Sequence, residues 1–474
     1  MDTIPLVIDL DGTLIRSDML VESGFSYLKQ NPLHVFNVTK WLVDSKTRLK
    51  RELAQQIDLD VTTLPYVPEV LAFIAQEKSN GRKIVLATAS HMIYAKKISN
   101  HLGLFDEVIA TENDVNLTAE RKADRLVHLY GKKGFDYAGN SMDDIAVWPM
   151  ARKAIIVNPE PGVLAKARKI GNVSQVINAK STLIKTLLKA FRMHQWAKNA
   201  LIFVPLLASH QISQIDKVAD GVIAFILFGL CASSVYLLND LLDIQDDRHH
   251  LTKRNRPFAS GALSIKTGII LFPLLLVGSF VGAYLLLPLY FLFALTIYYM
   301  LTVLYSFSLK RLVIIDVIVL AALYTMRIIA GTFAFEVSLT FWMLAFSMFI
   351  FLSLALVKRY TELAEARSAG NLEKARGRGY YPDDLEMISS LGAAAGYISV
   401  MVLALYIQDQ STISLYTHPH FIWLACPILL FWMSRVWLLT HRGQMHDDPV
   451  VFAIKDKVSI AVGLLFGLIF WLAV

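Results

Sequence analysis

Cysteine is nearly absent from this sequence. Cys231 and Cys426 are its only two cysteines, and both lie inside apolar runs. A structural disulfide or a thiolate metal site is therefore not expected. The first 190 residues hold no basic stripe with interleaved aromatic residues, which argues against nucleic-acid binding. The N-terminus has no basic segment ahead of a signal-type apolar core, so we expect the first domain to be cytoplasmic.

Charged residues are also scarce, at 18% of the chain against 55% hydrophobic residues, but the shortage is uneven. Up to about Leu188 the charge is ordinary for a soluble domain, and beyond it long apolar stretches dominate. The net charge of +7 is modest for 474 residues. We therefore predict a soluble domain over residues 1–178, a linker over 179–190 and a membrane domain over 191–474.

Short apolar segments alternate with helical ones in the soluble part. The first, Ile4 to Ile8, leads directly into Asp9-Leu10-Asp11-Gly12-Thr13. Further strands are predicted at 83–87, 107–110, 135–138 and 154–157, with helices at 68–77 and 122–130 between them. This alternation predicts a doubly wound α/β sheet with the two acids at the carboxyl edge of its strands.

Four segments in order, Asp9–Thr13, Thr88–Ser90, Lys122 and Asn140–Asp144, resemble the motifs of the haloacid dehalogenase (HAD) superfamily of phosphatases. The resemblance covers about residues 1–178. It implies that Asp9 is the nucleophile that forms an aspartyl-phosphate and that Asp11 is the general acid and base. It also implies that Thr88 holds a phosphoryl oxygen and that Lys122 neutralises charge between the nucleophile and the phosphate.

The same resemblance implies a Mg²⁺ site built from Asp9, the backbone carbonyl of Asp11, Asn140 and Asp144. The family usually has Asp where this chain has Asn140, and an amide oxygen supplies no charge. The alternative is a degenerate HAD domain that is kept as a scaffold or regulator. The helical segment at about residues 17–75 lies where this family inserts a cap that covers the site.

Long apolar runs beyond Arg192 predict about nine transmembrane helices, each near the ~20 residues that cross a bilayer. They are expected at 196–209, 220–238, 267–287, 289–306, 313–335, 339–357, 387–407, 421–439 and 458–474. Loops after the second, fourth, sixth and eighth runs hold five, two, six and three Lys or Arg residues, whereas the other loops hold only Lys217. The positive-inside rule therefore predicts that the HAD domain and the charged loops are cytoplasmic and that the C-terminus is outside.

An acidic motif, Asn239-Asp240-Leu-Leu-Asp243-Ile-Gln-Asp-Asp247, follows the second run directly. On a continuous helix the i, i+3 and i+7 spacing puts three carboxylates on one face. Unpaired, each charge at membrane depth costs roughly 2.5–3.5 kcal/mol, so the face needs cations. We predict Mg²⁺ bound by Asp240, Asp243 and Asp247, with Asn239 assisting, as a bridge to a pyrophosphate. A solvated loop with incidental acids is the alternative.

Basic residues that could bind phosphate groups lie near this motif and in other loops. Each of the peripheral ones could equally serve only as an orientation signal. The predicted set is Arg192, Lys198, Lys253, Arg254, Arg256, Lys310, Lys358 and Arg359. Arg376, Arg378, Asp447, Asp448 and Asp456 continue the pattern of mixed acids and bases in the third and fourth charged loops.

The second part resembles the UbiA prenyltransferase superfamily over about residues 191–474. Arg192–Asn199, Thr252–Pro257, Tyr305-Ser306, Asp316, Arg327 and His446–Pro449 resemble its decaprenyl-phosphate phosphoribosyltransferase branch. That branch moves a phosphoribosyl group from phosphoribosyl pyrophosphate (PRPP) to polyprenyl phosphate.

The resemblance therefore implies PRPP, polyprenyl phosphate and membrane lipids as partners, and a bacterial inner membrane as the location. The lipid phosphate would meet Lys198, Lys358 and Arg359, and the diphosphate or 5-phosphate would meet Lys253, Arg254 and Arg256. The HAD domain would remove the 5-phosphate of the product and leave polyprenyl-phosphoryl-ribose, a precursor for arabinose-type glycans. Two alternatives stay open: aromatic prenyl transfer to a hydroxybenzoate or quinone precursor, and a transporter or scaffold with a silent HAD domain.

Overall fold

The computed structural model describes residues 4–112, 116–178, 183–250, 252–370, 373–374, 378–409, 416–445 and 448–474. The chain divides into two compact units. The first comprises Met1–Phe191 together with Tyr236–Phe272, and the second comprises Arg192–Val235 with Pro273–Val474. The acidic motif therefore packs as part of the first unit.

A parallel sheet forms the centre of the first unit, with strand order β3-β2-β1-β4-β5-β6. This sheet and the helices between its strands confirm the predicted doubly wound α/β domain. Its strands are β1 (Leu6–Ile8), β2 (Ile84–His91), β3 (Glu107–Thr111), β4 (Asp136–Gly139), β5 (Ala154–Val157) and β6 (Val173–Ile177). Edge strand β6 was not predicted, because the polar pair Ser174-Gln175 interrupts its short apolar pattern.

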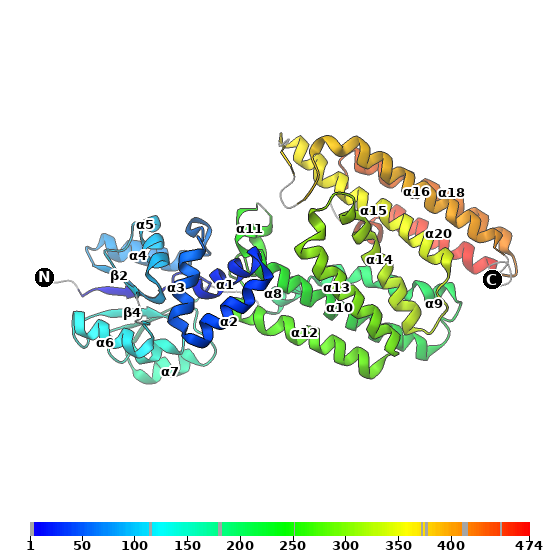
Figure 1. Cartoon of the computed structure of the whole chain (residues 1–474). Helices are drawn as coiled ribbons and strands as arrows, with labels where there is room; N and C mark the ends of the chain where they lie inside the picture. Colours follow the sequence, from blue (N-terminus) through cyan, green and yellow to red (C-terminus); the bar gives the residue numbers. More distant parts are fainter. Residues whose placement is uncertain are drawn as a thin grey trace. The chain divides into compact units, whose positions relative to one another are not determined.

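Helices cover both faces of this sheet, as Figure 1 shows. Successive side chains of a strand point to opposite faces. Leu6 and Ile8 of β1 therefore join a core with α4 and α5, while Val7 joins a second core with α6 and α7. These helices are α4 (Pro68–Ser79), α5 (Met92–Leu102), α6 (Ala119–Tyr130) and α7 (Val163–Ile170), and α8 (Leu183–Ala190) follows the sheet.

Three helices form a cap between β1 and α4: α1 (Met19–Gln30), α2 (Val35–Asp44) and α3 (Lys46–Gln56). Short 3-10 turns, η1 (Pro32–His34) and η2 (Val61–Thr63), connect and end them. Asp18 begins α1 by accepting a hydrogen bond from the Val21 amide at 3.1 Å, which satisfies one free donor of the first turn. The apolar faces of the cap reach the first core through Tyr27, Trp41 and Leu53.

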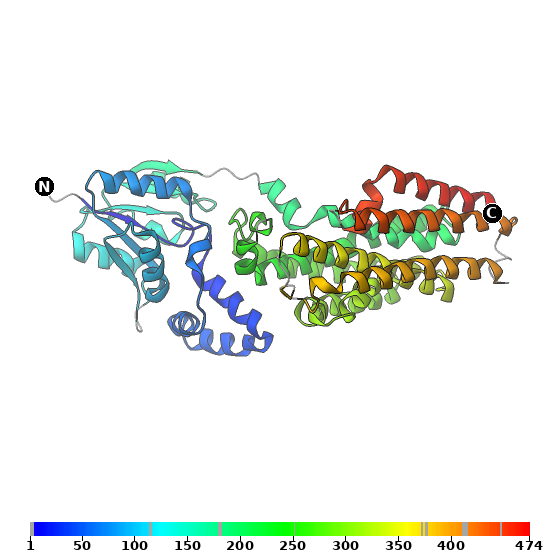
Figure 2. The ribbon, with the colours of Figure 1, turned by 90° about the horizontal axis from the view of Figure 1, so that it is seen from above.

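The second unit is helical, and seven of the described helices are long and apolar enough to cross a membrane. A bent pair, α19 (Pro449–Lys455) and α20 (Lys457–Ala473), meets at 82° and would make an eighth span. The chain is therefore a multi-pass membrane protein, and the predicted number of nine is approximate. The helices are α10 (Ile215–Leu242), α12 (Ile265–Leu286), α13 (Leu289–Phe307), α14 (Ile315–Ala334), α15 (Phe341–Ser368), α16 (Leu385–Gln408, preceded by η7, Pro382–Asp384) and α18 (Ala425–His441, preceded by η8, Pro419–Leu424). Figure 2 shows α15, in yellow, side by side with α16, in orange.

The segment predicted as the first span, 196–209, is not a single helix of spanning length. It consists of 3-10 turns, η4 (Met193–Phe203), followed by the five-residue α9 (Val204–Ala208). Its side chains nevertheless follow α10 in the antiparallel direction: Trp196 contacts Gly229 and Phe203 contacts Gly221. This segment therefore runs along α10 in an irregular conformation.

Candidate active sites

The carboxyl ends of β1 and β4 meet at the centre of the sheet, where the strand order reverses and α/β proteins bind ligands. Asp9 and Asp11 follow β1, and the loop Asn140–Asp144 follows β4. Thr88 lies within β2, which pairs with β1 on the other side. The fold thus brings the four predicted HAD motifs to one edge of the sheet.

Lys122 connects the two sides of this site. Its Nζ donates to Asp9 Oδ1 at 2.7 Å and to the hydroxyl of Tyr137 at 2.9 Å, and it lies 3.8 Å from Asp144 Oδ1. Tyr137 in turn donates to Asp144 Oδ1 at 2.7 Å. Burial raises the pKa of Asp9 to about 7, although the charge of Lys122 acts in the opposite direction. The lysine therefore favours the ionised form of the predicted nucleophile.

Asp11 is held by groups from the cap and from β2. Its Oδ1 accepts the Met19 amide of α1 at 2.8 Å, and its Oδ2 accepts the Ser90 hydroxyl at 2.6 Å. Burial, reinforced by the charge of Asp18, raises the pKa of Asp11 to about 6 against the hydrogen bond from Ser90. A carboxyl group that titrates near neutral pH suits proton transfer in both directions.

Asn140 lies against Gly12. A Cβ added at Gly12 would come within 2.2 Å of the side-chain nitrogen of Asn140. Thr13 donates to its Oδ1 at 3.3 Å. The Oδ2 of Asp144 accepts three hydrogen bonds, from the Asn140 amide, the Ser141 amide and the Ser141 hydroxyl, at 2.9–3.0 Å. Oxygen donors from Asp9, Asn140 and the Asp11 carbonyl fit a hard cation, and Asp144 as a direct ligand stays a prediction.

A cap lysine that the sequence did not single out also belongs to this site. Lys50 of α3 donates to the Ala89 carbonyl at 2.5 Å, next to Thr88, and to Asn116 at 2.9 Å. Burial lowers its pKa to about 8. No local motif marks Lys50, but a lysine on the inner face of an amphipathic cap helix is a signal that could have found it.

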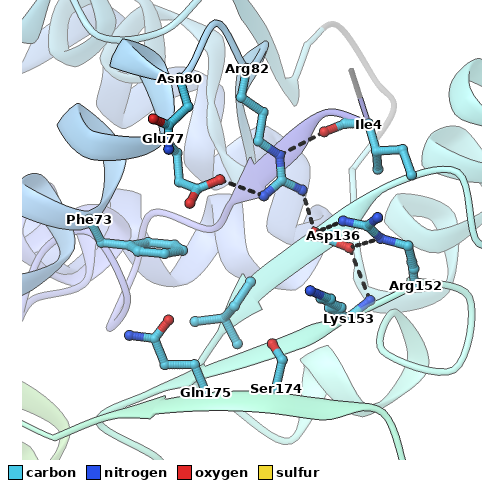
Figure 3. A pocket seen from close by; sticks show the side chains of 11 residues that line it. Ile4, Phe73, Glu77, Asn80, Arg82, Asp136, Arg152, Lys153, Ser174 and Gln175 are labelled. Carbon is cyan, nitrogen blue, oxygen red and sulfur yellow. Dashed lines mark hydrogen bonds and ion pairs between the residues drawn. The ribbon is translucent and has the colours of Figure 1, made fainter. Parts of the chain in front are cut away.

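A polar cavity of about 510 Å³ lies at the other edge of the sheet. Figure 3 shows Asp136, at the start of β4, between Arg82 and Arg152 in this cavity. Asp136 pairs with Leu6 at the start of β1, so the cavity is at the amino ends of the strands, away from Asp9. The ion pairs there have a structural role in the sheet.

The acidic motif lies where α10 ends and α11 (Ile244–His249) begins. We expected one continuous helix face with three carboxylates, and this is wrong for Asp243, which caps α11 in a non-helical conformation. Asp240 and Asp247 do converge: Nη1 of Arg256 lies 3.1 Å from Asp240 Oδ1 and 2.8 Å from Asp247 Oδ2. Both carboxylates are almost fully buried. Burial raises the pKa of Asp247 against the charge of Arg256.

Asp243 turns instead toward the cap, where its Oδ1 lies 2.7 Å from Lys29 Nζ. Among the described residues, no group of three His, Cys, Asp or Glu side chains is arranged to hold a metal ion. The buried pair Asp240 and Asp247, with part-buried Asn239, is the oxygen donor set that fits a divalent cation. Lys253 and Arg254 are exposed beside it, on η5 (Lys253–Asn255).

A second charged cluster lies in the second unit around Asp448. Lys198 Nζ donates to Asp448 Oδ2 at 2.7 Å, and Lys358 Nζ lies 3.6 Å from the same oxygen. Tyr324 donates to Asp448 at 3.0 Å. Lys198 and Asp448 are buried, whereas Lys358 is about one-third exposed. Two ammonium groups thus share one carboxylate, which leaves positive charge available to an anion.

Arg327 of α14 is buried next to this cluster. Its Nε donates to Asn199 at 3.1 Å, and its guanidinium carbon lies 5.1 Å from the ring centre of Tyr298 and 5.7 Å from that of Tyr324. Arg327 thus faces the interior of the bundle. Arg435 of α18 is part-exposed and pairs with Asp456 at 2.7 Å.

Arg359 belongs to a different cluster from Lys198 and Lys358. Its Nη2 lies 2.8 Å from Asp316 Oδ2, and Tyr380 donates to the other oxygen of Asp316 at 2.5 Å. Arg378 donates to Tyr305 at 2.7 Å and lies 3.8 Å from Asp316. A role for Arg359 in phosphate binding stays a prediction.

The remaining predicted residues are more peripheral. Arg192 precedes η4, and Lys310 lies in η6 (Leu309–Arg311), both part-exposed. Arg376, His446 and Asp447 lie outside the described residues.

Taken together, a multi-pass helical domain with buried acidic and basic clusters and an α/β domain with paired aspartates define a membrane transferase that carries a phosphatase domain. Residues 200–455 match the model of the UbiA prenyltransferase family, and residues 6–147 match that of haloacid dehalogenase-like hydrolases. The chain belongs to the UbiA prenyltransferase family, with an N-terminal HAD-like domain. Members of both families generally depend on divalent metal ions.

The proteins similar to this chain include two relatives and one solved structure described next. The uncharacterized protein y4nM of Sinorhizobium fredii is 35% identical over 99% of this chain and 91% of its own length. The decaprenyl-phosphate phosphoribosyltransferase of Mycobacterium tuberculosis is 32% identical over 59% of this chain and 90% of its own length. The structure of a UbiA homolog from Archaeoglobus fulgidus bound to GPP and Mg²⁺ aligns with 61% of this chain and 99% of its own, at 14% identity and a TM-score of 0.46.

Proposed function

We propose that the membrane domain transfers a phosphoribosyl group from PRPP to a polyprenyl phosphate and releases pyrophosphate. The bond between ribose C1 and the pyrophosphate oxygen breaks, and a bond between C1 and an oxygen of the lipid phosphate forms. The similarity to a phosphoribosyltransferase supports this donor and acceptor.

The observation that carries the proposal is the cluster of Lys198, Lys358 and Asp448. Two lysines around one carboxylate leave a net positive charge in a mostly buried setting. A neutral quinone precursor would leave that charge uncompensated, and the single carboxylate of a hydroxybenzoate would need only one of the two lysines. A lipid phosphate, with up to two negative charges, is stabilised by both. We therefore assign Lys198 and Lys358 to binding of the lipid phosphate.

Asp240 and Asp247 would hold a divalent cation, with Asn239 and Asp243 beside them. A bound Mg²⁺ would neutralise the charge of the leaving pyrophosphate. Arg256, which bonds to Asp240 and Asp247, keeps the two carboxylates together and would also contact a diphosphate. Lys253 and Arg254 would bind the outer phosphate groups, and Arg192, Lys310 and Arg359 stay further candidates for phosphate binding.

The HAD domain would then remove the 5-phosphate of the lipid-linked product. Asp9 attacks the phosphorus, and Asp11 protonates the departing 5-oxygen; water, deprotonated by Asp11, next releases inorganic phosphate from Asp9. Lys122 stabilises the ionised Asp9, and Thr88 and Lys50 line the side where phosphoryl oxygens would bind. The product is polyprenyl-phosphoryl-ribose, suited as a precursor of arabinose-type donors, on the cytoplasmic face of a bacterial inner membrane.

The donor is tested with purified protein in detergent, Mg²⁺ and a polyprenyl phosphate. One reaction receives labelled PRPP, and a second receives a prenyl diphosphate with 4-hydroxybenzoate. We expect label to move from PRPP into lipid in the first reaction and to be lost in Asp240→Ala. Transfer only in the second reaction would replace the proposal with aromatic prenyl transfer.

The phosphatase step is tested by mass spectrometry of the lipid product. Wild-type protein should yield the dephosphorylated ribosyl lipid, and Asp9→Asn should yield the lipid that retains the 5-phosphate. Identical, fully phosphorylated products from both proteins would contradict this step.

A further inference from the structure

Cap helix α1 carries a buried ion pair that lies between the two sets of catalytic residues in the first unit. Glu22 of α1 accepts hydrogen bonds from Nη1 of Arg248 at 2.7 Å and from Nη2 at 2.6 Å. The Glu22 side chain is 0% exposed and that of Arg248 is 2% exposed. The two hydrogen bonds fix the geometry of this pair. Loss of either partner would leave a buried charge without compensation.

Further hydrogen bonds at this pair connect the acidic segment, which is the acidic motif together with the rest of α11, to the cap. Gln245 of α11 also donates to Glu22, at 2.7 Å, and Nε of Arg248 donates to the Ala259 carbonyl at 3.0 Å. Arg248 directly follows Asp247, and Ala259 lies three residues after Arg256. The pair therefore holds both the helix that carries Asp247 and the loop that carries Arg256.

Two turns further along α1, on the same face, Lys29 contacts Asp243 at 2.7 Å and also pairs with Asp246. A third contact is a close backbone approach: Gly261 has φ of +67°, and a Cβ there would lie 2.5 Å from Cβ of Arg16. His249 Nε2 lies 3.2 Å from Asp60 at the end of the cap. Cap residues thus contact the chain at Asp243, Asp246, His249 and Gly261, in addition to Arg248.

Met19, the first residue of α1, contacts the phosphatase site. The Met19 amide donates to Asp11, so only one helical turn separates a contact to the phosphatase acid from Glu22. A single rigid helix is therefore bonded both to Asp11 and to the segment that carries Asp240–Asp247.

We propose that α1 is a positioning element of the transferase site. Glu22 holds α11 through Arg248 so that Asp247 and Asp240 face one another, and Lys29 competes with a divalent cation for Asp243. This inference rests on the proposed cation-binding role of the acidic segment. By this proposal the HAD cap positions residues of the transferase site as well as those of the phosphatase site.

The test compares Glu22→Gln and Lys29→Met in the full-length protein, with transfer from labelled PRPP measured against Mg²⁺ concentration. Glu22→Gln should raise the half-saturating Mg²⁺ concentration by about tenfold or more, because α11 loses its anchor. Lys29→Met should lower it by about two- to fivefold, because a competing cation is removed from a part-exposed carboxylate. Exposed Lys40→Met on α2 and Glu120→Gln on α6 are the matched controls and should leave it unchanged.

Opposite shifts from two residues of one helix cannot come from general destabilisation. A second readout needs no activity: hydrogen exchange of the α11 amides in Mg²⁺-free protein should be faster in Glu22→Gln and unchanged in the controls. If Glu22→Gln fails to fold, Gly261→Ala, which separates the loop from Arg16 without removing a charge, should give the same faster exchange.

Wild-type exchange of α11 in Glu22→Gln would overturn the proposal, as would equal Mg²⁺ dependence in all variants. If the α11 amides exchange faster in Glu22→Gln but neither the wild type nor any variant transfers label from PRPP, the positioning role is supported and the proposed donor is rejected. The two failures are therefore distinguishable.

Discussion

Asn140 is the residue at which the resemblance to HAD phosphatases leads us to expect an Asp. Its amide packs against the backbone of Gly12 and accepts from Thr13, so it lies within the site and is well ordered by its contacts. A carboxylate of the same size would fit this position. Steric hindrance therefore does not explain why this position holds a neutral side chain.

We predict that Asn140→Asp lowers the Mg²⁺ concentration needed for phosphatase activity, by roughly tenfold, because an anionic ligand replaces a neutral one. The measurement is release of inorganic phosphate from the ribosyl lipid as a function of Mg²⁺. Exposed Asn100→Asp on α5 is the control for an added charge elsewhere. An unchanged Mg²⁺ dependence in Asn140→Asp would contradict cation binding at this residue.

Asp136 shows how charge is used for stability in the same domain. Its side chain is 1% exposed and accepts from Arg152 at 2.7 and 2.9 Å and from Arg82. Burial acts to raise the pKa of Asp136, but the bonds from the two arginines outweigh burial and leave it below its usual value. The ionised form is therefore stabilised by folding.

We predict that Asp136→Asn lowers the free energy of unfolding of the domain by about 3 kcal/mol near neutral pH. Because the folded pKa lies below the unfolded value of about 3.9, the contribution is present above that pH and is lost as pH falls further. The difference between the two proteins, measured by hydrogen exchange of β4 at a series of pH values, should shrink below about pH 4. Exposed Asp124→Asn on α6 should show no difference at any pH.

At the scale of elements, α14 and η4 approach unusually closely. A Cβ on Gly331 of α14 would lie 2.1 Å from the Ile202 carbonyl oxygen of η4. Only glycine permits this approach, because backbone atoms cannot move aside as a flexible side chain can. The contact also keeps Arg327, one turn earlier on α14, next to Asn199.

We predict that Gly331→Ala lowers the Tm of the protein in detergent by several degrees and weakens transfer, because the substitution costs roughly 1–3 kcal/mol of overpacking. Gly278→Ala on α12 is the matched control, since nothing lies within 4 Å of its added Cβ. Equal Tm values for the two variants would show that η4 can shift without loss of stability.

The acidic motif illustrates what element-level prediction misses. Its i, i+3, i+7 spacing predicts one helix face, and Asp240 and Asp247 do meet. The one-residue break at Asp243 was not predictable, because it depends on tertiary partners: Lys29 from the cap for Asp243, and Arg256 for the other two acids.

At the scale of the whole molecule, the charged loops predict which ends of the helices face the cytoplasm. Cys231 and Cys426 are 0% and 7% exposed, so the native chain offers little background for thiol labelling. Two exposed residues, His420 and Arg442, lie at opposite ends of the segment formed by η8 and α18.

We predict that a membrane-impermeant maleimide labels His420→Cys in intact spheroplasts and labels Arg442→Cys only after permeabilisation. The reason is that the loop with Arg442 belongs to the basic set and the loop with His420 does not. Wild-type protein is the control for background. The reverse pattern would place the HAD domain and the C-terminus on the sides opposite to those proposed.

The sequence by itself determined the α/β class of the N-terminal part and the helical class of the rest, and it predicted residues that the fold brings to one edge of the sheet. These follow from local patterns: strand and helix periodicity, apolar runs of spanning length, and acids placed directly after strands. The number of spans was predicted less well, because η4 runs along α10 without helical periodicity.

Only the tertiary structure decided which charges meet. Lys198 and Asp448 are separated by 250 positions, and Glu22 and Arg248 by 226, so no local pattern connects them. The same holds for Lys50 beside Thr88 and for Arg359, which pairs with Asp316 instead of joining Lys358. Such pairs form because folding buries distant side chains together, and a buried charge is stable only beside an opposite one.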